Sequence, residues 1–176
     1  MSGIKFSRWA LRFATTVVLA MTLAGTSAAR AAALADSTLE AAIAESHKAL
    51  RAILNGDPKL YEALFADRDD ITLGNPFGPY AKGKVEVVKT LAGAASKYRD
   101  GEVIGVDRVA TYVNDNLACI VEGEHLRAKV GTSDKLSAFS TRVTSVYERA
   151  AGRWRLVHRH ADPITTPRPA ESVLGR

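Results

Sequence analysis

The sequence of 176 residues contains a single cysteine, Cys119, so no disulfide can form within the chain. Proline and glycine are sparse, with 6 and 13 residues, and aromatic residues make up only 7%. These low counts exclude a disulfide-stapled scaffold, a collagen-like repeat and a proline-rich disordered chain. Hydrophobic residues at 47% and charged residues at 24% instead indicate one globular domain. Cys119 lies in the apolar run 117–121, which predicts a buried, unreactive thiol on a strand.

After its first 31 residues, the sequence also lacks a basic segment that could bind a nucleic acid. The net charge is +5, but residues 1–31 hold four basic residues and no acidic one. The rest of the chain holds the other 20 of the 24 basic residues against all 19 acidic ones, which is a net charge of +1. Because a phosphate backbone is bound by clustered basic side chains, we expect no nucleic-acid partner.

The sequence has no hydrophobic run long enough to cross a membrane comfortably. Residues 1–31 combine a basic start, an apolar run over 13–24 and small residues around Ala29 and Ala31, which are the three parts of a secretory signal. The apolar run is shorter than the roughly 20 residues that span a hydrocarbon core. We therefore predict a signal peptide over 1–31 and a periplasmic or secreted mature protein without membrane attachment. An uncleaved membrane anchor is the alternative.

The first half of the mature chain has helical periodicity. Residues 37–40 read Ser-Thr-Leu-Glu, a capping box with Ser37 as the helix cap. Behind it, apolar residues recur at spacings of three and four, and His47 shares their face. Asn55-Gly56 ends this helix, and Asp57-Pro58 begins the next. The predicted elements are helices at 39–54, 58–65 and 83–98 and a short strand at 70–73.

The second half of the chain has the pattern of long strands. Runs rich in β-branched residues are separated by turn residues, and they predict strands at 102–113, 117–129, 137–149 and 153–160. Residues 114–116 and 150–152 join successive strands as hairpins. Helices followed by such a meander predict an α+β domain over 32–163, with three helices on an antiparallel sheet. Residues 164–176 are expected to form a loosely ordered tail.

Two local segments point to a known family. Residues 66–78, ADRDDITLGNPFG, resemble the segment that leads into the catalytic strand of ketosteroid isomerases. Residues 141–143, TRV, and the pattern G-x-W-x-x-V-H-x-H at 152–160 resemble the association domain of calcium/calmodulin-dependent protein kinase II. Over 37–163 the chain therefore resembles the nuclear transport factor 2-like superfamily, which includes the SnoaL-like cyclases. The resemblance implies a cone-shaped fold, in which a strongly curved sheet encloses a pocket beneath the helices.

The resemblance does not extend to the catalytic groups of the isomerases. Those enzymes use an aspartate base, a tyrosine and a protonated aspartic acid. The resemblance places Asn75 at the base, Ala49 or Leu50 at the tyrosine and Thr144 at the second acid. None of these side chains can replace the acid or base at its position, so the same steroid isomerisation is not expected. Any catalysis would be acid–base chemistry of an isomerase, cyclase or lyase type with other groups.

The last hairpin predicts which side chains share a face. If residues 150–152 form a three-residue loop with Gly152 in the left-handed region, Arg142 lies opposite His160. Strand alternation then places one set of side chains on a common face: Ser140, Arg142, Thr144, Val146, Leu156, His158 and His160. Because Thr144 takes a catalytic position of the family, this face is predicted to line the pocket. A two-residue loop would turn Arg142 to the other face.

This face predicts a site for a small, mostly apolar molecule with an acidic or carbonyl oxygen. A guanidinium can hold such an oxygen with two hydrogen bonds, and imidazoles can donate or transfer a proton near neutral pH. We predict proton transfer next to a carbonyl, or addition of water, with His158 and His160 as catalytic residues. The predicted ligand-binding residues are Arg142, Asn75, Thr144, His47 and Tyr80. The sequence contains no phosphate-binding loop, nucleophile elbow or Cys-x-x-Cys motif, and we expect no cofactor.

Three other interpretations remain open. Arg142 could pair with a neighbouring acid such as Glu122 or Glu124, while the histidines form hydrogen bonds within the sheet. His158, His160 and Asp162 have the spacing of metal ligands on an extended chain, but Arg142 beside them would repel a cation, so no metal is expected. The protein could also be a non-catalytic association module. Its homodimer would form through an outer sheet face that carries Val143, Tyr147 and Val157.

Overall fold

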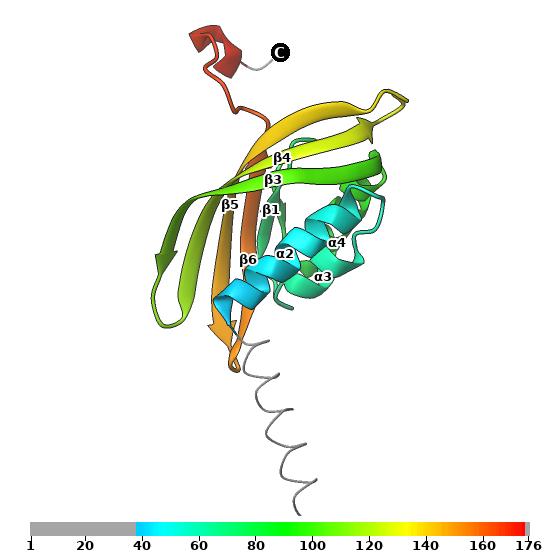
Figure 1. The fold of residues 1–176 in the computed structure, drawn as a ribbon. Helices are drawn as coiled ribbons and strands as arrows, with labels where there is room; N and C mark the ends of the chain where they lie inside the picture. Colours follow the sequence, from blue (N-terminus) through cyan, green and yellow to red (C-terminus); the bar gives the residue numbers. More distant parts are fainter. Residues whose placement is uncertain (1–37, 175–176) are drawn as a thin grey trace, which may run out of the picture. The chain divides into compact units, whose positions relative to one another are not determined.

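The computed structural model describes residues 38–174 (Figure 1). The predicted signal peptide therefore lies outside the described residues. The elements follow the chain in the order α2 (Leu39–Ile53), α3 (Lys59–Leu64), β1 (Thr72–Gly74), β2 (Ala81–Lys82), α4 (Lys84–Ala95), β3 (Tyr98–Val113), β4 (Leu117–Val130), β5 (Ser137–Ala150), β6 (Arg153–Asp162) and a short 3-10 helix, Ala170–Val173. None of the helices in this part of the chain has the length and apolar character needed to cross a membrane.

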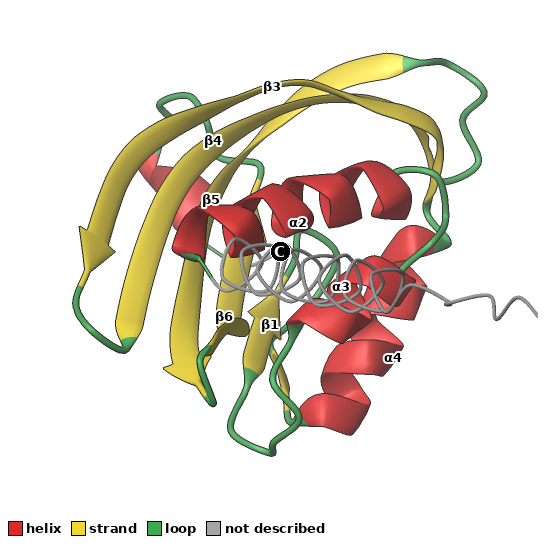
Figure 2. Cartoon of the chain, turned by 60° about the horizontal axis from the view of Figure 1, so that its bottom comes forward, coloured by secondary structure: helices red, strands yellow, loops and turns green. Residues whose placement is uncertain are grey.

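The sheet has six strands in the order β2-β1-β6-β5-β4-β3. All neighbouring strands are antiparallel except β1 and β6, which pair in parallel. The sheet is curved, and α2, α3 and α4 lie on its inner side (Figure 2). The α+β class, the three helices and the four long strands are thus confirmed. The two-residue strand β2 and the parallel pairing of β1 were not predicted, because neither is long enough to show a pattern.

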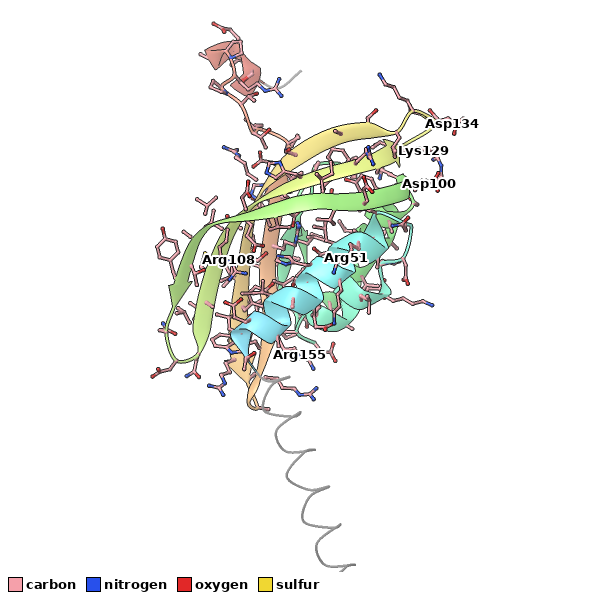
Figure 3. All side chains as sticks on the ribbon, viewed as in Figure 1. Arg51, Asp100, Arg108, Lys129, Asp134 and Arg155 are labelled. Atoms are coloured by element: carbon pink, nitrogen blue, oxygen red, sulfur yellow. The ribbon has the colours of Figure 1, made fainter. Side chains whose placement is uncertain are left out.

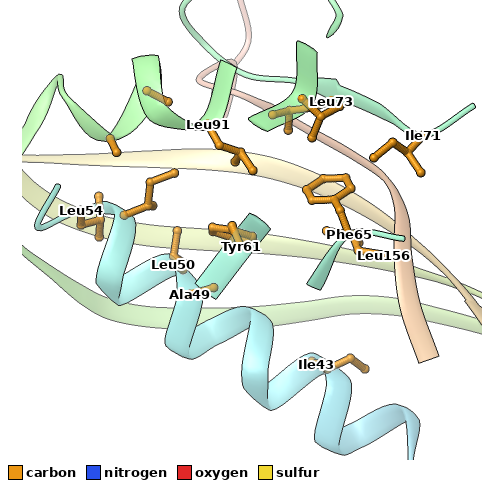
Figure 4. Close-up of a cluster of buried hydrophobic side chains, with 14 of the residues drawn as sticks. Ile43, Ala49, Leu50, Leu54, Tyr61, Phe65, Ile71, Leu73, Leu91 and Leu156 are labelled. Carbon is orange, nitrogen blue, oxygen red and sulfur yellow. The ribbon is translucent and has the colours of Figure 1, made fainter. Parts of the chain in front are cut away.

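The helix α2 begins where a side chain can satisfy a free backbone amide. Thr38 is its cap, and the Thr38 hydroxyl accepts a hydrogen bond from the Ala41 amide at 3.1 Å. The cap is thus one residue later than the predicted Ser37. The apolar face of α2 packs into the core, where Ile43, Leu50 and Leu54 are buried together with residues of α3, β1, α4 and β6 (Figure 4).

The register of the last hairpin differs from the prediction. Ala150 pairs with Arg153, so the loop has two residues, Ala151 and Gly152, rather than three. Both have positive φ angles, 50° and 78°, as a type I′ turn requires. An alanine at positive φ is unfavourable, which is why the sequence favoured a longer loop with glycine alone in that region.

A bulge in β6 then changes which residues face inward. The register shifts between Val146 and Tyr147, so that Leu156 lies opposite Tyr147 whereas His158 lies opposite Val146. Val157 is the extra residue. Because of this bulge, the side chains of Leu156 and His158, which flank Val157, face opposite sides of the sheet.

The predicted inner face is the outer one for its polar residues, whereas Leu156 of the same predicted set is buried on the inner side. Arg142, Thr144, His158 and His160 do share a face, but Arg142 pairs with Asp162 and Thr144 with His160 on the side away from the helices. The inner face of β5 carries Thr141, Val143, Ser145 and Tyr147, all buried. Val143 and Tyr147 were predicted to form an outer row, and that prediction is wrong for the same reason.

Cys119 also lies on the outer face. It is opposite Val146 on β5 and Tyr112 on β3. Its side chain is partly exposed rather than buried, because the even-numbered residues of β4, such as Ala118 and Ile120, take the inner positions.

Candidate functional site

A cavity of about 60 Å³ lies between the inner face of the sheet and the helices. Its polar lining consists of Tyr61, Asn75, Tyr98, Glu124, Thr141 and Arg159, and its other lining residues are apolar. These polar residues come from α3, from the end of β1 and from four strands that adjoin in the sheet. The cavity therefore has the composition of a small-molecule site, which is largely apolar with a few polar groups at fixed positions.

An ion pair between Arg159 and Glu124 forms the polar centre of this cavity. Arg159 Nη2 donates to Glu124 Oε1 at 2.5 Å, and the Thr141 hydroxyl donates to Glu124 Oε2 at 3.1 Å. The side chains of Arg159 and Glu124 are only 9% and 4% exposed. Burial by itself would lower the pKa of Arg159, but the negative charge of Glu124 outweighs this effect and raises it. The guanidinium therefore stays charged and paired.

Two tyrosines flank the ion pair. The Arg159 Cζ atom lies 5.4 Å from the centre of the Tyr61 ring, a cation–π contact. Burial raises the pKa of Tyr61 well above its usual value, and burial likewise raises the pKa of Tyr98 to about 12. Both hydroxyls are therefore protonated near neutral pH and can donate a hydrogen bond. Tyr98 forms ring contacts with Phe77 and Phe139, but its hydroxyl forms no hydrogen bond with another described residue.

Asn75 is the one predicted ligand residue that the structure places at this cavity. It follows β1, and its Oδ1 atom accepts a hydrogen bond from the Phe77 amide at 2.9 Å, which fixes the loop. Within residues 38–174 the amide nitrogen of Asn75 has no hydrogen-bond partner. It is therefore a second donor at the cavity that protein groups leave free.

His47 belongs to a separate polar cluster. Its Nε2 atom lies 3.2 Å from both carboxylate oxygens of Glu122, which Arg108 also contacts at 3.4 Å. Arg108 extends from β3 and also donates to Glu40 of α2 at 2.9 Å (Figure 3). Burial would raise the pKa of Glu122, but the hydrogen bond from His47 and the charges of His47 and Arg108 outweigh burial and lower it. His47 is thus hydrogen-bonded to a buried carboxylate and does not line the cavity.

Arg142 is on the outer face, where its partner is Asp162. Arg142 Nε and Nη2 donate to the two carboxylate oxygens at 3.0 Å each, and the Arg142 side chain is 60% exposed. Burial would raise the pKa of Asp162, but the hydrogen bonds from Arg142 and from the Ile164 amide lower it. The expectation that Arg142 points into the pocket is therefore wrong, and its acidic partner is neither Glu122 nor Glu124.

His158 and His160 also lie on the outer face. His158 Nδ1 is 2.8 Å from the Thr72 hydroxyl, an arrangement set by the parallel pairing of β1 with β6. Burial, and then the charge of His160, lower the pKa of His158. The ring of Tyr80, which is 62% exposed, lies 5.4 Å from the ring of His160. The prediction that these imidazoles face the cavity is wrong, and Thr144 is likewise on their side of the sheet.

Metal ligands are not grouped in the described part of the chain. No group of three or more histidine, cysteine, aspartate or glutamate side chains there could hold a metal ion. In the predicted His158, His160 and Asp162 set, the Asp162 carboxylate already accepts hydrogen bonds from Arg142.

The cavity residues Arg159, Glu124, Thr141, Tyr61 and Tyr98 were not predicted. One signal was present in the sequence. Glu122 and Glu124 alternate with apolar residues along β4, so both carboxylates had to face the same side of the sheet. Had that side been recognised as the inner one, a buried cationic partner on a neighbouring strand would have been required, because a buried carboxylate is stable only when paired.

Comparison with known proteins defines the family of this chain. Residues 39–165 match the model of the SnoaL-like domain, and the protein belongs to this family. Solved structures with the same fold are members of the nuclear transport factor 2-like superfamily. A search among curated proteins finds no match.

Three similar structures illustrate how the fold is used. One is a candidate calcium/calmodulin-dependent protein kinase type II association domain from Thiobacillus denitrificans, 23% identical, with a TM-score of 0.59 over 72% of this chain and 94% of that one. A candidate dehydratase of the NTF2-like family from Streptomyces avermitilis is 19% identical, with a TM-score of 0.60 over 73% and 94%. A ketosteroid isomerase-like protein from Erwinia carotovora is 16% identical, with a TM-score of 0.61 over 73% and 95%. These similarities establish the fold alone.

Proposed function

We propose that this protein binds a small, mostly apolar molecule in the inner cavity through a carbonyl or hydroxyl oxygen. The observation that carries the proposal is the pair of free donors, the Tyr98 hydroxyl and the Asn75 amide, beside the buried Arg159–Glu124 ion pair. A ligand oxygen would accept from these donors while its carbon skeleton contacts the apolar lining. The similarity to structures described as a candidate dehydratase and a ketosteroid isomerase-like protein supports a small-molecule ligand.

A neutral oxygen suits this cavity better than an acidic one. Glu124 already balances the charge of Arg159, so a carboxylate in the cavity would add an uncompensated negative charge. The acidic oxygen that the sequence predicted for the ligand therefore has no cationic partner in the inner cavity. The same pairing makes Glu124 a poor base, since both of its oxygens accept hydrogen bonds. We therefore propose binding as the function of this cavity and assign no proton transfer to Glu124.

Binding of 2-butanone, which is small enough for this cavity, tests this proposal. We expect a dissociation constant of roughly 10 mM, as for a ligand of this size with moderate efficiency. The probe is expected to shift the methyl NMR signals of Leu50, Leu91 and Leu126, which line the cavity. The variant Ala161→Val adds two carbons inside the cavity and is expected to weaken binding at least about tenfold.

The matched control is Ala138→Val, on the exposed outer side of β5, which should leave binding unchanged. If 2-butanone shifted none of these methyl signals, or bound Ala161→Val as well as the unaltered protein, the cavity would not be the binding site.

We also propose a homodimer through the outer sheet face, with a different set of residues from the predicted row. Cys119, Val121 and Val146 form a partly exposed apolar centre on this face, next to Tyr112, which is 63% exposed. Val121→Asp is expected to reduce the mass measured by light scattering from dimer to monomer. The exposed control Val85→Asp on α4 should leave the mass unchanged, and a monomeric unaltered protein would contradict the proposal.

Export remains the proposal for location, and it rests on the composition of residues 1–31. A mature protein that begins near residue 32, as measured by intact-protein mass spectrometry, would support it, whereas an unprocessed chain would contradict it.

A further inference from the structure

A second hollow, which we call the outer groove, lies directly beside the inner cavity. Its volume is about 330 Å³, and it is lined by residues of the loop 75–80, of β2 and of α4 and by Lys97, which follows α4. Asn75, Phe77 and Ala94 line both the outer groove and the inner cavity. The two spaces are therefore separated by the thickness of single side chains.

The size of the inner cavity indicates that a ligand extends beyond it. Its volume of about 60 Å³ is well below the roughly 150 Å³ of an apolar protein cavity that holds benzene. The inner cavity thus has room for the oxygen-bearing end of a molecule and a few carbons. The rest of such a molecule needs a neighbouring space, and the outer groove is one that shares a wall with the cavity.

Phe77 is the side chain that divides the two spaces. Its ring centre lies 5.4 Å from that of Tyr98, and the Lys97 ammonium lies 5.0 Å from the Phe77 ring centre. Phe77 is 38% exposed, so the protein does not enclose its ring completely. A rotation of this side chain would join the spaces without a change in the helices or the sheet.

The wall that α4 contributes to the outer groove contains an unexpected glycine. Gly93 lies inside the helix, where glycine is less stable than alanine. A Cβ atom added at Gly93 would meet no atom within 4 Å, so packing does not require glycine there. The missing side chain instead leaves space in the groove, on the helix side that also carries Glu86 and Thr90.

The charges of the outer groove favour an anion. Lys82 and Lys97 line it, and Glu86 is its one acidic lining residue. Glu86 is already 3.7 Å from Lys89 of the same helix, and Lys89 does not line the groove. The lining thus carries two positive charges against one negative charge, and Lys89 partly balances that negative charge from outside the groove. The outer groove therefore supplies the positive charge that the inner cavity lacks.

We propose that the outer groove and the inner cavity are two parts of one binding site for an elongated oxo- or hydroxy-carboxylic acid. The neutral oxygen occupies the inner cavity, the carboxylate lies between Lys82 and Lys97, and Phe77 moves aside to let the chain pass. This assignment rests on the proposed function of the inner cavity. It adds the second subsite, the charge of the ligand and the residue that controls entry.

Two probes of equal length test the assignment in the full chain. 7-Oxooctanoate carries a carboxylate where 2-octanone carries a methyl group, and both end in the same methyl ketone. We expect 7-oxooctanoate to bind at least about tenfold more tightly by titration calorimetry. In the double variant Lys82→Met/Lys97→Met this advantage should disappear, while 2-octanone should bind as before. Lys89→Met removes one positive charge on α4 outside the groove, and this control should keep the advantage.

Two further variants test the groove and the aromatic divider. Gly93→Ala is expected to raise the melting temperature of the free protein and to weaken the binding of 7-oxooctanoate several-fold. Because the variant is more stable, a folding defect cannot explain the loss of affinity. Phe77→Ala is expected to accelerate the association of 2-octanone, as measured by NMR line shapes.

The outcomes separate the two proposals. If 2-octanone binds but 7-oxooctanoate binds no more tightly, the proposed second subsite is wrong and the proposal for the inner cavity stands. The same conclusion follows if 7-oxooctanoate still binds the double lysine variant more tightly than 2-octanone does. If neither probe binds, the proposed function itself is wrong. If Ala161→Val leaves 7-oxooctanoate binding unchanged while the lysine variant abolishes it, the groove binds alone and the joint site is overturned.

Discussion

Replacement of Arg159 by methionine is expected to destabilise the protein by about 3–5 kcal/mol, the usual effect of removing one member of a buried ion pair. Methionine fills a similar volume, but it leaves the Glu124 carboxylate, which is 4% exposed, with only the Thr141 hydroxyl as a partner. The contact with the Tyr61 ring is also lost. Urea denaturation at neutral pH measures the difference in the free energy of unfolding.

The matched control is Arg142→Met on the neighbouring strand. Its ion pair with Asp162 has good geometry, but the Arg142 side chain is 60% exposed, so we expect a loss below about 1 kcal/mol. A second change, Glu124→Gln in the Arg159→Met background, removes the unpaired charge and should recover a large part of the stability. Equal losses for the two arginine variants would contradict the description of Arg159 as the buried, paired cation.

The second large effect is expected for Gly101→Ala in β3. A Cβ atom at this position would lie 2.5 Å from Leu54 Cβ and 2.6 Å from the Leu54 carbonyl oxygen, so the end of α2 would have to move. Asn55 forms hydrogen bonds with the Gly101 carbonyl oxygen and amide at 2.8 and 3.2 Å, and this movement would disturb both. We expect a loss of about 3 kcal/mol, at the upper end of overpacking effects, measured by urea denaturation.

Gly105→Ala is the control for Gly101→Ala, because it lies in the same strand. The nearest atom to an added Cβ there is 4.0 Å away, which is an ordinary contact. The free energy of unfolding of this variant should stay within about 0.5 kcal/mol of the unaltered protein. If Gly101→Ala were equally harmless, the close approach of β3 to the end of α2 would be wrong.

The long strands could be predicted from the sequence because each has a strong local signal. The predicted strand 117–129 differs by one residue from β4, and 137–149 differs by one from β5. Long β-branched runs and the turn residues between them specify such boundaries without tertiary information. β2, with two residues, depends wholly on its pairing with β1 and has no comparable signal.

The candidate site could not be predicted in the same way, because it depends on register. Arg142, His158 and His160 were correctly placed on one face, but the choice of the inner face rested on a count back from the last hairpin. The two-residue loop and the bulge at Val157 each shift the pairing by one residue, so together they keep these side chains on one face, and the inner side was chosen only because the resemblance placed Thr144 at a catalytic position. Neither feature has a sequence signal as strong as the periodic spacing of hydrophobic residues. Ala151 has a φ of 50°, whereas alanine prefers negative φ angles.

Asn75 shows what local sequence can specify. Its position depends on the short strand β1 and the following turn, which residues 66–78 already indicated, and no long-range count enters. The distant partners Glu124 and Arg159 come from strands separated in the sheet by β5, so only the folded arrangement joins them.

The bulge at Val157 also bears on how an interior of this kind can change during evolution. If the extra residue were accommodated beyond Ala161 instead, regular alternation would turn both imidazoles of β6 toward the helices and Arg159 toward solvent. In that register the interior would carry titratable rings in place of a fixed positive charge. Relatives could exchange one for the other by relocating an irregularity in a single strand, without substituting any of the three side chains.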